Sequence, residues 1–300
     1  MELKQLEAFV RVAEVGSFSR AATLMRLPQP SLSRYVRGLE VELRETLFTR
    51  TGRGVQLTDA GKRLYLHAAA IVQLAVRARD EVAAYRGRPT GRVVVGMPPS
   101  VGRQLTPALV ERFKAQCPEA RLSVVEALSA NLAEWIATGR ADLALLHNPE
   151  PNESIEIKPL LEEPLCLVTI RRGRARQSMG AALRLKELSA YRLIVPDLGN
   201  TIRRFLEAQA ARAGIRLEVA LEVSSIPTII DLVVRGYGCA VLTASAVAIS
   251  GRGDRLTLRP LVEPRLMSTL CLATSATKRK TPLVAEVSAI LSRLVGSIPR

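Results

Sequence analysis

The sequence predicts an α/β protein of several domains, with a mainly helical N-terminal region, one long helix, and a C-terminal region of two α/β lobes. Three observations predict this arrangement. Residues 1–57 contain short helical patterns interrupted by glycine and proline, and residues 58–86 keep a helical repeat without any proline. From residue 91 onward, strand-like and helix-like segments alternate, which is typical of mostly parallel sheets covered by helices.

The composition is that of a globular and strongly basic chain. Its 300 residues, 48% of them hydrophobic, suggest about two domains. The net charge of +15 at pH 7 favours a polyanionic partner, either nucleic acid or an anionic membrane surface. Glu2, Glu7 and Glu14 interrupt the apolar residues of the N-terminus, so we expect no signal peptide. No continuous apolar run is long enough to span a membrane, and we expect a cytoplasmic protein without membrane contact.

The sequence lacks the patterns of metal sites and of common enzymes. It contains no CxxC pair, and only two histidines are present, His67 and His147, so we expect no metal site. It also contains no G-x-S-x-G, Walker or dinucleotide-binding fingerprint, so we expect neither an enzyme nor a bound cofactor. The four widely separated cysteines, expected to be reduced, are Cys117, Cys166, Cys239 and Cys271.

The N-terminal region begins with three predicted short helices. Apolar residues at helical spacing form the first, which Gly16 ends, and Ser17 or Ser19 can cap the second. Pro30 suits the first turn of the third helix, because its missing N–H would be unpaired there in any case. We expect the third helix to extend to about Leu43.

The third helix has one apolar face and one polar face. The residues predicted to point inward are Leu32, Val36, Leu39 and Leu43, and those predicted to point outward are Ser31, Ser33, Arg34 and Arg37. Short polar side chains and arginines can reach base edges and phosphates in the major groove of DNA. A solvated amphipathic helix would have the same pattern, so this helix alone does not decide between the two interpretations.

A short hairpin is predicted after the third helix. Two strand-like segments, residues 47–50 and 55–57, flank a glycine-containing turn with Arg53 at its tip. A helix, a turn, an arginine-bearing helix and a basic hairpin together resemble a winged helix-turn-helix domain, here residues 1–57. In such domains the hairpin contacts double-stranded DNA beside the recognition helix.

Several residue pairs in this region keep a distinctive order and spacing. They are Ala21-Ala22, Gln29-Pro30, Leu32-Ser33, Leu39-Glu40, Leu47-Phe48, Leu57-Thr58 and Ala60-Gly61, together with Arg50. This pattern resembles the N-terminal signature of the LysR-type transcriptional regulators. The resemblance implies that Gln29, Pro30, Ser33 and Arg34 face the major groove, and that Arg53 lies on the wing.

Two positions depart from the family pattern. Arg44 stands where the family usually has a turn glycine, and Pro28 where it usually has Ser or Thr. We therefore expect Arg44 to need a positive φ, at a cost of about 1 kcal/mol, unless the turn is built differently. Pro28 cannot supply a capping hydroxyl, and Pro30 can partly offset that loss.

Residues 58–86 predict one helix of roughly 40 Å. Its apolar residues recur at alternating steps of four and three, which forms a heptad seam: Leu64, Ala68, Ile71, Ala75, Ala78, Val82 and Tyr85. The seam could pack along the core of its own chain, or it could pair with a second copy in an antiparallel dimer. The family resemblance supports the dimer. Residues 58–90 are thus the predicted linker, and residues 87–91 its hinge.

The region from residue 91 to 300 predicts two α/β lobes. Strands are expected at 92–95, 121–126, 142–146, 166–170, 192–195, 217–223, 239–242 and 271–274. Helices are expected at 104–116, 129–138, 201–213, 228–236 and 283–295. Lobe 1 would comprise residues 91–161 and 267–300, and lobe 2 residues 162–266.

A cleft between two such lobes is the expected ligand site. Ligands bind beyond the C-terminal ends of parallel strands, where helices begin, and hydroxyls beside free N–H groups there favour a carboxylate or similar anion. Residues at such helix openings are Ser100, Val101, Ser129, Asn200 and Thr201. Each of them alone could equally be an ordinary helix cap.

Four C-terminal segments, residues 91–100, 105–113, 137–144 and 236–240, resemble the effector domain of the same family, whose fold is similar to type 2 periplasmic binding proteins. The resemblance implies effector contacts at Ser100, Ser129 and Thr201, with Arg203 as a weaker candidate counter-ion for an acidic effector. It also implies homodimers that associate into homotetramers, and promoter activation through contact with RNA polymerase.

Two other functions remain as alternatives at this point. The two-lobed region would suit a substrate-binding protein for transport, but the predicted DNA-binding domain and the lack of a signal peptide oppose it. An enzyme with a regulatory DNA-binding domain would need a base and a nucleophile, and no motif supplies that pair. The sequence therefore favours a DNA-binding transcriptional regulator that responds to a small-molecule effector.

Overall fold

The computed structural model describes residues 1–300 except 53, 85–89, 172–178, 279 and 299–300. The chain divides into two compact units: residues 1–86 together with 138–140, and the remainder of residues 87–300. Within the described part, no helix is long and apolar enough to cross a membrane.

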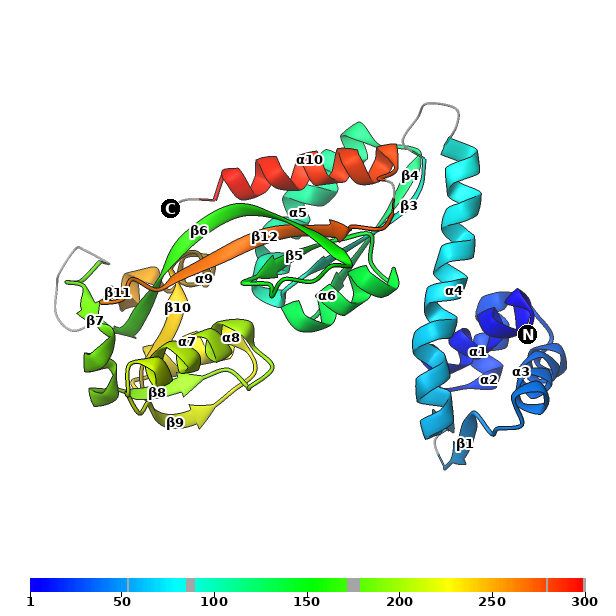
Figure 1. The fold of residues 1–300 in the computed structure, drawn as a ribbon, viewed down its shortest axis with the longest axis horizontal. Helices are drawn as coiled ribbons and strands as arrows, with labels where there is room; N and C mark the ends of the chain where they lie inside the picture. Colours follow the sequence, from blue (N-terminus) through cyan, green and yellow to red (C-terminus); the bar gives the residue numbers. More distant parts are fainter. Residues whose placement is uncertain (53, 85–89, 172–178, 279, 299–300) are drawn as a thin grey trace. The chain divides into compact units, whose positions relative to one another are not determined.

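The N-terminal unit consists of four helices and a hairpin. In chain order these are α1 (Leu3–Val15), α2 (Phe18–Met25), α3 (Gln29–Leu43), β1 (Phe48–Thr51), β2 (Gly54–Leu57) and α4 (Asp59–Ala84), as Figure 1 shows in blue and cyan. The first three helices and the start of α4 enclose one apolar core, in which Phe9, Leu32 and Leu39 are fully buried. This arrangement confirms the predicted winged helix-turn-helix.

Local chemistry fixes the helix ends as the sequence predicts. Gly16 ends α1 with φ 65°, and the Ser17 hydroxyl accepts a hydrogen bond from the Arg20 N–H to cap α2. Arg44 ends α3 with φ 54°, which confirms that it takes the left-handed conformation normally given to glycine. Arg26 does the same at the end of α2, with φ 53°. Pro28 precedes α3 without a side-chain cap.

The hairpin is held against the end of α1. The Val55 N–H donates to the Gly16 carbonyl oxygen at 3.0 Å. Gly54 has φ 138°, and a Cβ at this position would collide with the same carbonyl oxygen. Only glycine therefore allows the close approach that fixes the wing beside the helices.

Lobe 1 of the C-terminal unit is a sheet with helices on both faces. Its elements are β3 (Gly91–Met97), α5 (Pro99–Gln116), β4 (Ala120–Glu126), α6 (Ser129–Thr138), β5 (Leu143–His147), β12 (Met267–Ser275) and α10 (Pro282–Gly296). Strand β3 lies parallel to β4 and to β5. Alternate residues of β3 face opposite sides: Val93 and Val95 pack with α5 and α10, and Val94 packs with α6.

Lobe 2 follows the same principle. Its elements are β7 (Leu183–Arg184), the 3-10 helix η1 (Leu185–Ala190), β8 (Arg192–Val195), α7 (Thr201–Arg212), β9 (Glu218–Glu222), α8 (Ile226–Val234), β10 (Ala240–Thr243), α9 (Ala244–Ile249), η2 (Gly253–Arg255) and β11 (Leu256–Val262). Helix α8 covers Cys166 and Val168 on one face, whereas α7 covers Leu165 and Leu167 on the other.

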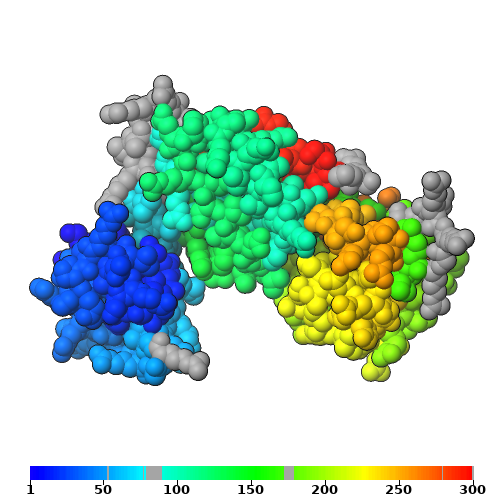
Figure 2. All heavy atoms as spheres, turned by 180° about the vertical axis from the view of Figure 1, so that it is seen from behind, coloured from blue at the N-terminus to red at the C-terminus, as the bar shows by residue number. Residues whose placement is uncertain are grey.

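Two long strands connect the lobes. Strand β6 (Ile155–Ile170) pairs with β12 along its first half, and with β10 and β11 along its second half. The sheet order is therefore β4-β3-β5-β12-β6-β11-β7, with β10 also beside β6. In the space-filling view, lobe 1 is the green mass and lobe 2 the yellow and orange one (Figure 2).

The structure extends the predicted strands in this region. The expected strand at 166–170 begins instead at Ile155, and β11 was not expected at all. Pro159, Glu162 and Pro164 interrupt the apolar pattern of β6, which hid its first half. The register with β12 shifts beside Pro159, which has no N–H to offer to the ladder.

Candidate functional sites

Helix α3 presents two arginines on its outward side. Arg34 and Arg37 are exposed, and neither has a partner within the part of the chain that the structure describes. Both stand opposite the buried face formed by Leu32, Val36 and Leu39. These guanidinium groups are therefore available to a polyanionic ligand.

The other predicted DNA contacts lie at the start of the same helix. Gln29 and Pro30 are exposed, while Ser31 and Ser33 are partly exposed. The Gln29 Nε2 donates to the Ser33 hydroxyl at 3.2 Å, so these two side chains lie side by side on one turn. The structure brings together all the predicted contacts of α3. Arg53 lies outside the described residues.

A cavity of about 440 Å³ opens between the two lobes of the C-terminal unit. Four of the predicted effector-binding residues line it: Ser100, Ser129, Asn200 and Thr201. Volumes of this order are usual for small-molecule sites. Segments that are distant in the sequence also line it, including His147, Asp197, Ser225 and Thr243, which sequence reasoning did not propose.

Two predicted effector residues are placed elsewhere. Val101 is only 6% exposed and packs into the apolar core of lobe 1, because its position on the first turn of α5 points toward the sheet. Arg203 is 8% exposed and does not line this cavity. Neither side chain is part of the cavity wall.

Helix starts from both lobes surround the cavity, and several hydroxyls and amides there act as caps. The Asn200 Oδ1 accepts hydrogen bonds from the N–H groups of Ile202 and Arg203, at 3.0 and 3.2 Å. Ser225 caps α8 by accepting from the Thr228 N–H. Asn200 is thus a helix cap as well as a cavity residue, and its carboxamide nitrogen remains for a ligand.

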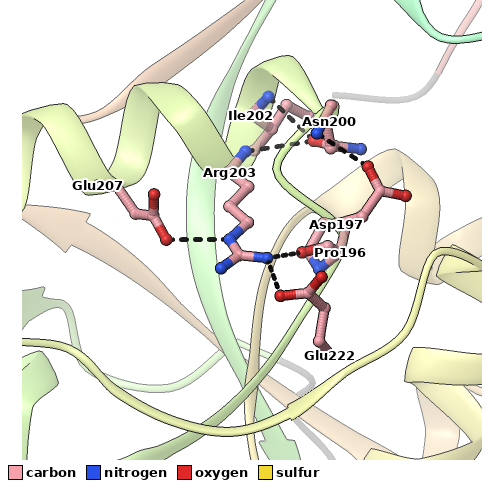
Figure 3. Close-up of polar contacts among 8 residues, drawn as sticks. Pro196, Asp197, Asn200, Ile202, Arg203, Glu207 and Glu222 are labelled. Atoms are coloured by element: carbon pink, nitrogen blue, oxygen red, sulfur yellow. Dashed lines mark hydrogen bonds and ion pairs between the residues drawn. The ribbon is translucent and has the colours of Figure 1, made fainter.

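Arg203 holds the loop that forms one wall of the cavity (Figure 3). Its guanidinium donates to the Pro196 carbonyl oxygen at 2.6 Å, to Glu222 at 2.6 Å and to Glu207 at 2.9 Å. Two carboxylates thus neutralise this buried cation, so it cannot serve as a counter-ion for an acidic effector. Arg203 is a positioning residue for the loop from Pro196 to Asn200.

His147 forms part of the cavity wall from lobe 1. Its backbone N–H donates to the Ser129 hydroxyl at 3.0 Å, and its ring Nδ1 lies 3.2 Å from the Ser268 hydroxyl on β12. Burial lowers the pKa of His147 from 6.5 to about 4, so the imidazole is neutral at pH 7. A neutral imidazole can offer a ligand a hydrogen bond but no positive charge.

Acidification should weaken the folded state through His147. Because the folded-state pKa is lowered, the unfolded chain binds the proton first, and stability should fall as the pH drops from 6.5 to about 4. Denaturant unfolding at several pH values checks this, by comparing the unaltered chain with His147→Gln. The free-energy difference between the two should change over that window, and a constant difference would contradict the assignment. His67→Gln, at an exposed histidine on α4, is the control.

Among the described residues, no group of three or more His, Cys, Asp or Glu side chains could hold a metal ion. The cysteines are reduced, and burial raises the pKa of the Cys166 thiol to about 11. The cavity therefore offers hydrogen-bonding groups and apolar walls to a ligand.

Two protein families match this chain, and together the matches span most of it. Residues 3–62 match the family of bacterial regulatory helix-turn-helix proteins of the lysR type, and residues 86–295 match the LysR substrate binding domain family. The chain belongs to the LysR family. It is a LysR-type transcriptional regulator, with a helix-turn-helix for DNA binding and a domain for effector binding.

Full-length relatives agree with this assignment. The LysR-type regulator is 29% identical to the nitrogen assimilation regulatory protein nac of Escherichia coli, over 99% of this chain and 96% of nac. It is 31% identical to the HTH-type transcriptional regulator BbuR of Bordetella bronchiseptica, over 97% of this chain and 88% of BbuR.

Solved structures share the fold over both units. Full-length CbnR in complex with its target DNA matches with a TM-score of 0.69 and 25% identity, covering 98% of this chain and all of CbnR. A full-length OxyR variant from Pseudomonas aeruginosa matches with a TM-score of 0.71 and 23% identity, over 99% and 95% of the two chains. The second likeness shows the fold alone.

The linker helix α4 of the regulator has two apolar sides with different roles. Leu64 and Ala68 of the predicted seam pack into the core of their own unit, and Ala68 is fully buried there. Ala75 is partly exposed, and Ala78 is exposed. The side chain of Val82 lies outside the described part of the chain. For Ala68, packing along the chain's own core is therefore the correct interpretation.

A further apolar stripe on α4 faces away from that core. Ile71 is 40% exposed and Leu74 is 56% exposed, and Ala78 follows them at helical spacing. Ile71 and Ala78 of the predicted seam thus lie on this exposed stripe, whereas its Leu64 and Ala68 face the core of the chain's own unit. Leu74 was missed because the heptad count does not include it.

Proposed function

We propose that this regulator binds operator DNA in the major groove through Gln29, Pro30, Ser33 and Arg34 at the start of α3. Ser31 and Arg37, beside them, contact the DNA backbone, and Arg53 extends the contact from the wing. The exposed Arg34 on the outward side of α3, which has no partner within the described part of the chain, is the observation that carries this proposal. The likeness to CbnR, which was solved with its target DNA, supports it.

The effector binds in the cavity between the lobes and changes how the regulator holds its DNA. Ser100, Ser129, Asn200 and Thr201 supply hydrogen bonds to it from four positions on the wall. Hydroxyls at the starts of α5 and α6 favour an anionic group on the effector at the lobe 1 side. The effector must bind two arrangements of the protein with different affinity, since otherwise it shifts no equilibrium.

The working unit is a homodimer that associates further into a homotetramer. Ile71, Leu74 and Ala78 form the apolar stripe through which α4 pairs with a second copy. The protein acts in the cytoplasm, where it contacts RNA polymerase at the promoters that it activates. It performs no catalysis, because the hydroxyl that the His147 ring contacts, that of Ser268, is 2% exposed and does not line the cavity.

Specific DNA binding is the decisive experiment. The purified chain should bind the DNA immediately upstream of its own gene at least about a thousandfold more tightly than random DNA, measured at two salt concentrations. The two salt concentrations separate phosphate contacts from base contacts. A lack of preference on that DNA, together with a lack of enriched sites in genome-wide DNA capture, would contradict the proposal.

Replacing Leu74 with glutamate should disrupt the dimer. A charge in the centre of the exposed stripe would lie in an apolar interface, at a cost of several kcal/mol. Light scattering on the full chain should show a dimer or tetramer at micromolar concentration, and a monomer for Leu74→Glu. Leu24→Glu, at a similarly exposed leucine on α2, is the control and should keep the original mass. A monomeric unaltered chain would refute the assembly.

A further inference from the structure

The charges on the cavity wall are unusual for so basic a protein. Among the described residues that line the cavity, none is Lys or Arg, although the chain has a net charge of +15. Asp197 supplies the only carboxylate on the described wall. His147 adds no charge at neutral pH, because burial lowers its pKa to about 4. The formal charge of the wall is therefore negative.

Nearby arginines do not neutralise Asp197. Arg203 is bound to Glu207 and Glu222, and Arg204 faces Glu150 at 3.8 Å. The Asp197 Oδ1 accepts a hydrogen bond from the Gly199 N–H at 2.9 Å, which holds the carboxylate in place on the loop (Figure 3). Within the described part of the chain, its Oδ2 has no hydrogen-bond partner. A half-buried carboxylate is thus held at the cavity with one oxygen unused.

An effector with only a negative charge would fit this wall poorly. Closing the cleft around it would bring two like charges together in a site without a described cation, and like charges at close range destabilise each other. An ammonium group on the effector removes this conflict, because it pairs with Asp197 directly. The helix starts at Ser100 and Ser129, on lobe 1, remain for the effector's anionic group.

We propose that the effector is a zwitterion of the α-amino-acid class, whose ammonium group binds the Asp197 carboxylate on lobe 2 while its carboxylate binds at the helix starts of lobe 1. This inference rests on the proposed function, because it names the ligand class of the same cavity. A ligand that carries one charge for each lobe also holds the two lobes together. Its binding is thereby coupled to cleft closure.

A binding series on the full chain tests the inference directly. Each common L-amino acid is added to the purified protein, beside the matching carboxylic acid that lacks the amine and the matching amide that lacks the carboxylate. Thermal unfolding identifies the binders, and calorimetry gives their dissociation constants. At least one amino acid should bind, and both of its analogues should bind at least about tenfold more weakly.

The Asp197→Asn variant then assigns the ammonium contact. Asparagine keeps the oxygen that accepts from Gly199, so the loop should retain its shape. The variant should lose at least about tenfold in affinity for the amino acid, and should lose little or nothing for the carboxylic acid without the amine. Asp254→Asn, at an exposed aspartate in η2, makes the same change in net charge and should bind like the unaltered chain.

Several outcomes would overturn the inference. They are equal or tighter binding of the carboxylic acids without the amine, the same affinity for the amino acid in Asp197→Asn, and no binding by any member of the series. The ligand series on the unaltered chain decides by itself if the variant does not fold. Operator binding is measured separately. A protein that binds its operator but takes only amine-free acids overturns this inference and leaves the proposed function intact.

Discussion

Replacing Arg34 with alanine is expected to weaken binding to operator DNA by about 1–3 kcal/mol, and to change binding to random DNA much less. The guanidinium is exposed and unpartnered in the described part of the chain, so its removal breaks no internal contact. The folded state should therefore keep its stability. A base-reading arginine contributes mainly to specific binding, whereas a phosphate-binding one contributes about equally to both kinds of DNA.

Titrations of both DNAs at two salt concentrations, on Arg34→Ala and on the unaltered chain, measure this effect. Arg212→Ala is the matched control, since Arg212 is an exposed arginine on α7 and its loss makes the same change in net charge. Equal losses on operator and random DNA would show that Arg34 contacts phosphate instead of a base. A loss as small as that of Arg212→Ala would remove Arg34 from the DNA interface.

Most of the N-terminal unit could be predicted because its signals are local. Gly16 ends α1 and Pro30 lies in the first turn of α3 for reasons that involve only neighbouring residues. Some residues in and beside the family-like pattern make contacts between distant segments that appear only in three dimensions. The Glu40 side chain accepts from the Leu47 N–H at 2.8 Å, and the Thr58 hydroxyl donates to the Thr46 carbonyl oxygen at 2.7 Å. These bonds join α3, the hairpin and α4.

The connecting strands of the C-terminal unit were harder to predict. A strand is recognised from sequence by alternation or by a continuous apolar run, and in the first half of β6 the alternation of residues 155–158 stops at Pro159. Polar residues interrupt its apolar ones, some of them exposed, such as Glu156 and Glu162, and some of them buried. Glu163, for example, is 5% exposed and accepts from the Ser245 hydroxyl at 2.7 Å. The partner of this buried carboxylate is 82 residues away in the sequence, so the local pattern does not reveal it.

Part of the cavity wall could be read from the sequence, and the rest could not. Ser100 and Ser129 were found because each begins a helix directly after a strand. His147 ends β5, and the end of a parallel strand is itself a signal that could have identified it. Asp197 and Thr243 come from lobe 2, and only the packing of the two lobes brings them to the same cavity.

The seam on α4 shows the limit of periodicity in another way. A repeat of four and three residues shows that one side of a helix is apolar. It does not show whether the chain's own unit or a second copy covers that side. Ala68 is covered by its own unit, whereas Leu74, outside the count, remains exposed. Which apolar residues of α4 are covered depends on where α1 packs against it. A contact between helices that are distant in the sequence cannot be detected from a local pattern.

Replacing Arg203 with alanine is expected to destabilise the C-terminal unit by about 2–3 kcal/mol. The guanidinium is 8% exposed and joins three acceptors, one of which is the Pro196 carbonyl oxygen. Removing one partner of a buried ion pair typically costs about 3–5 kcal/mol. The expected loss is smaller here, because Glu207 and Glu222 are 38% and 51% exposed and water can solvate them once Arg203 is gone.

Denaturant unfolding of Arg203→Ala, Arg203→Lys and Arg204→Ala separates the causes. Arg204→Ala removes an exposed arginine whose partner Glu150 is 84% exposed, so its cost should stay below about 0.5 kcal/mol. Arg203→Lys keeps the charge but cannot reach three acceptors at once, and should fall between the two. Because the same guanidinium anchors the loop that carries Asp197 and Asn200, both Arg203 variants should also weaken ligand binding in the cavity. Equal stability of Arg203→Ala and Arg204→Ala would mean that the two carboxylates hold Arg203 without any net gain, and the cavity loop would then owe its shape to the Asn200 cap and the Asp197 turn alone.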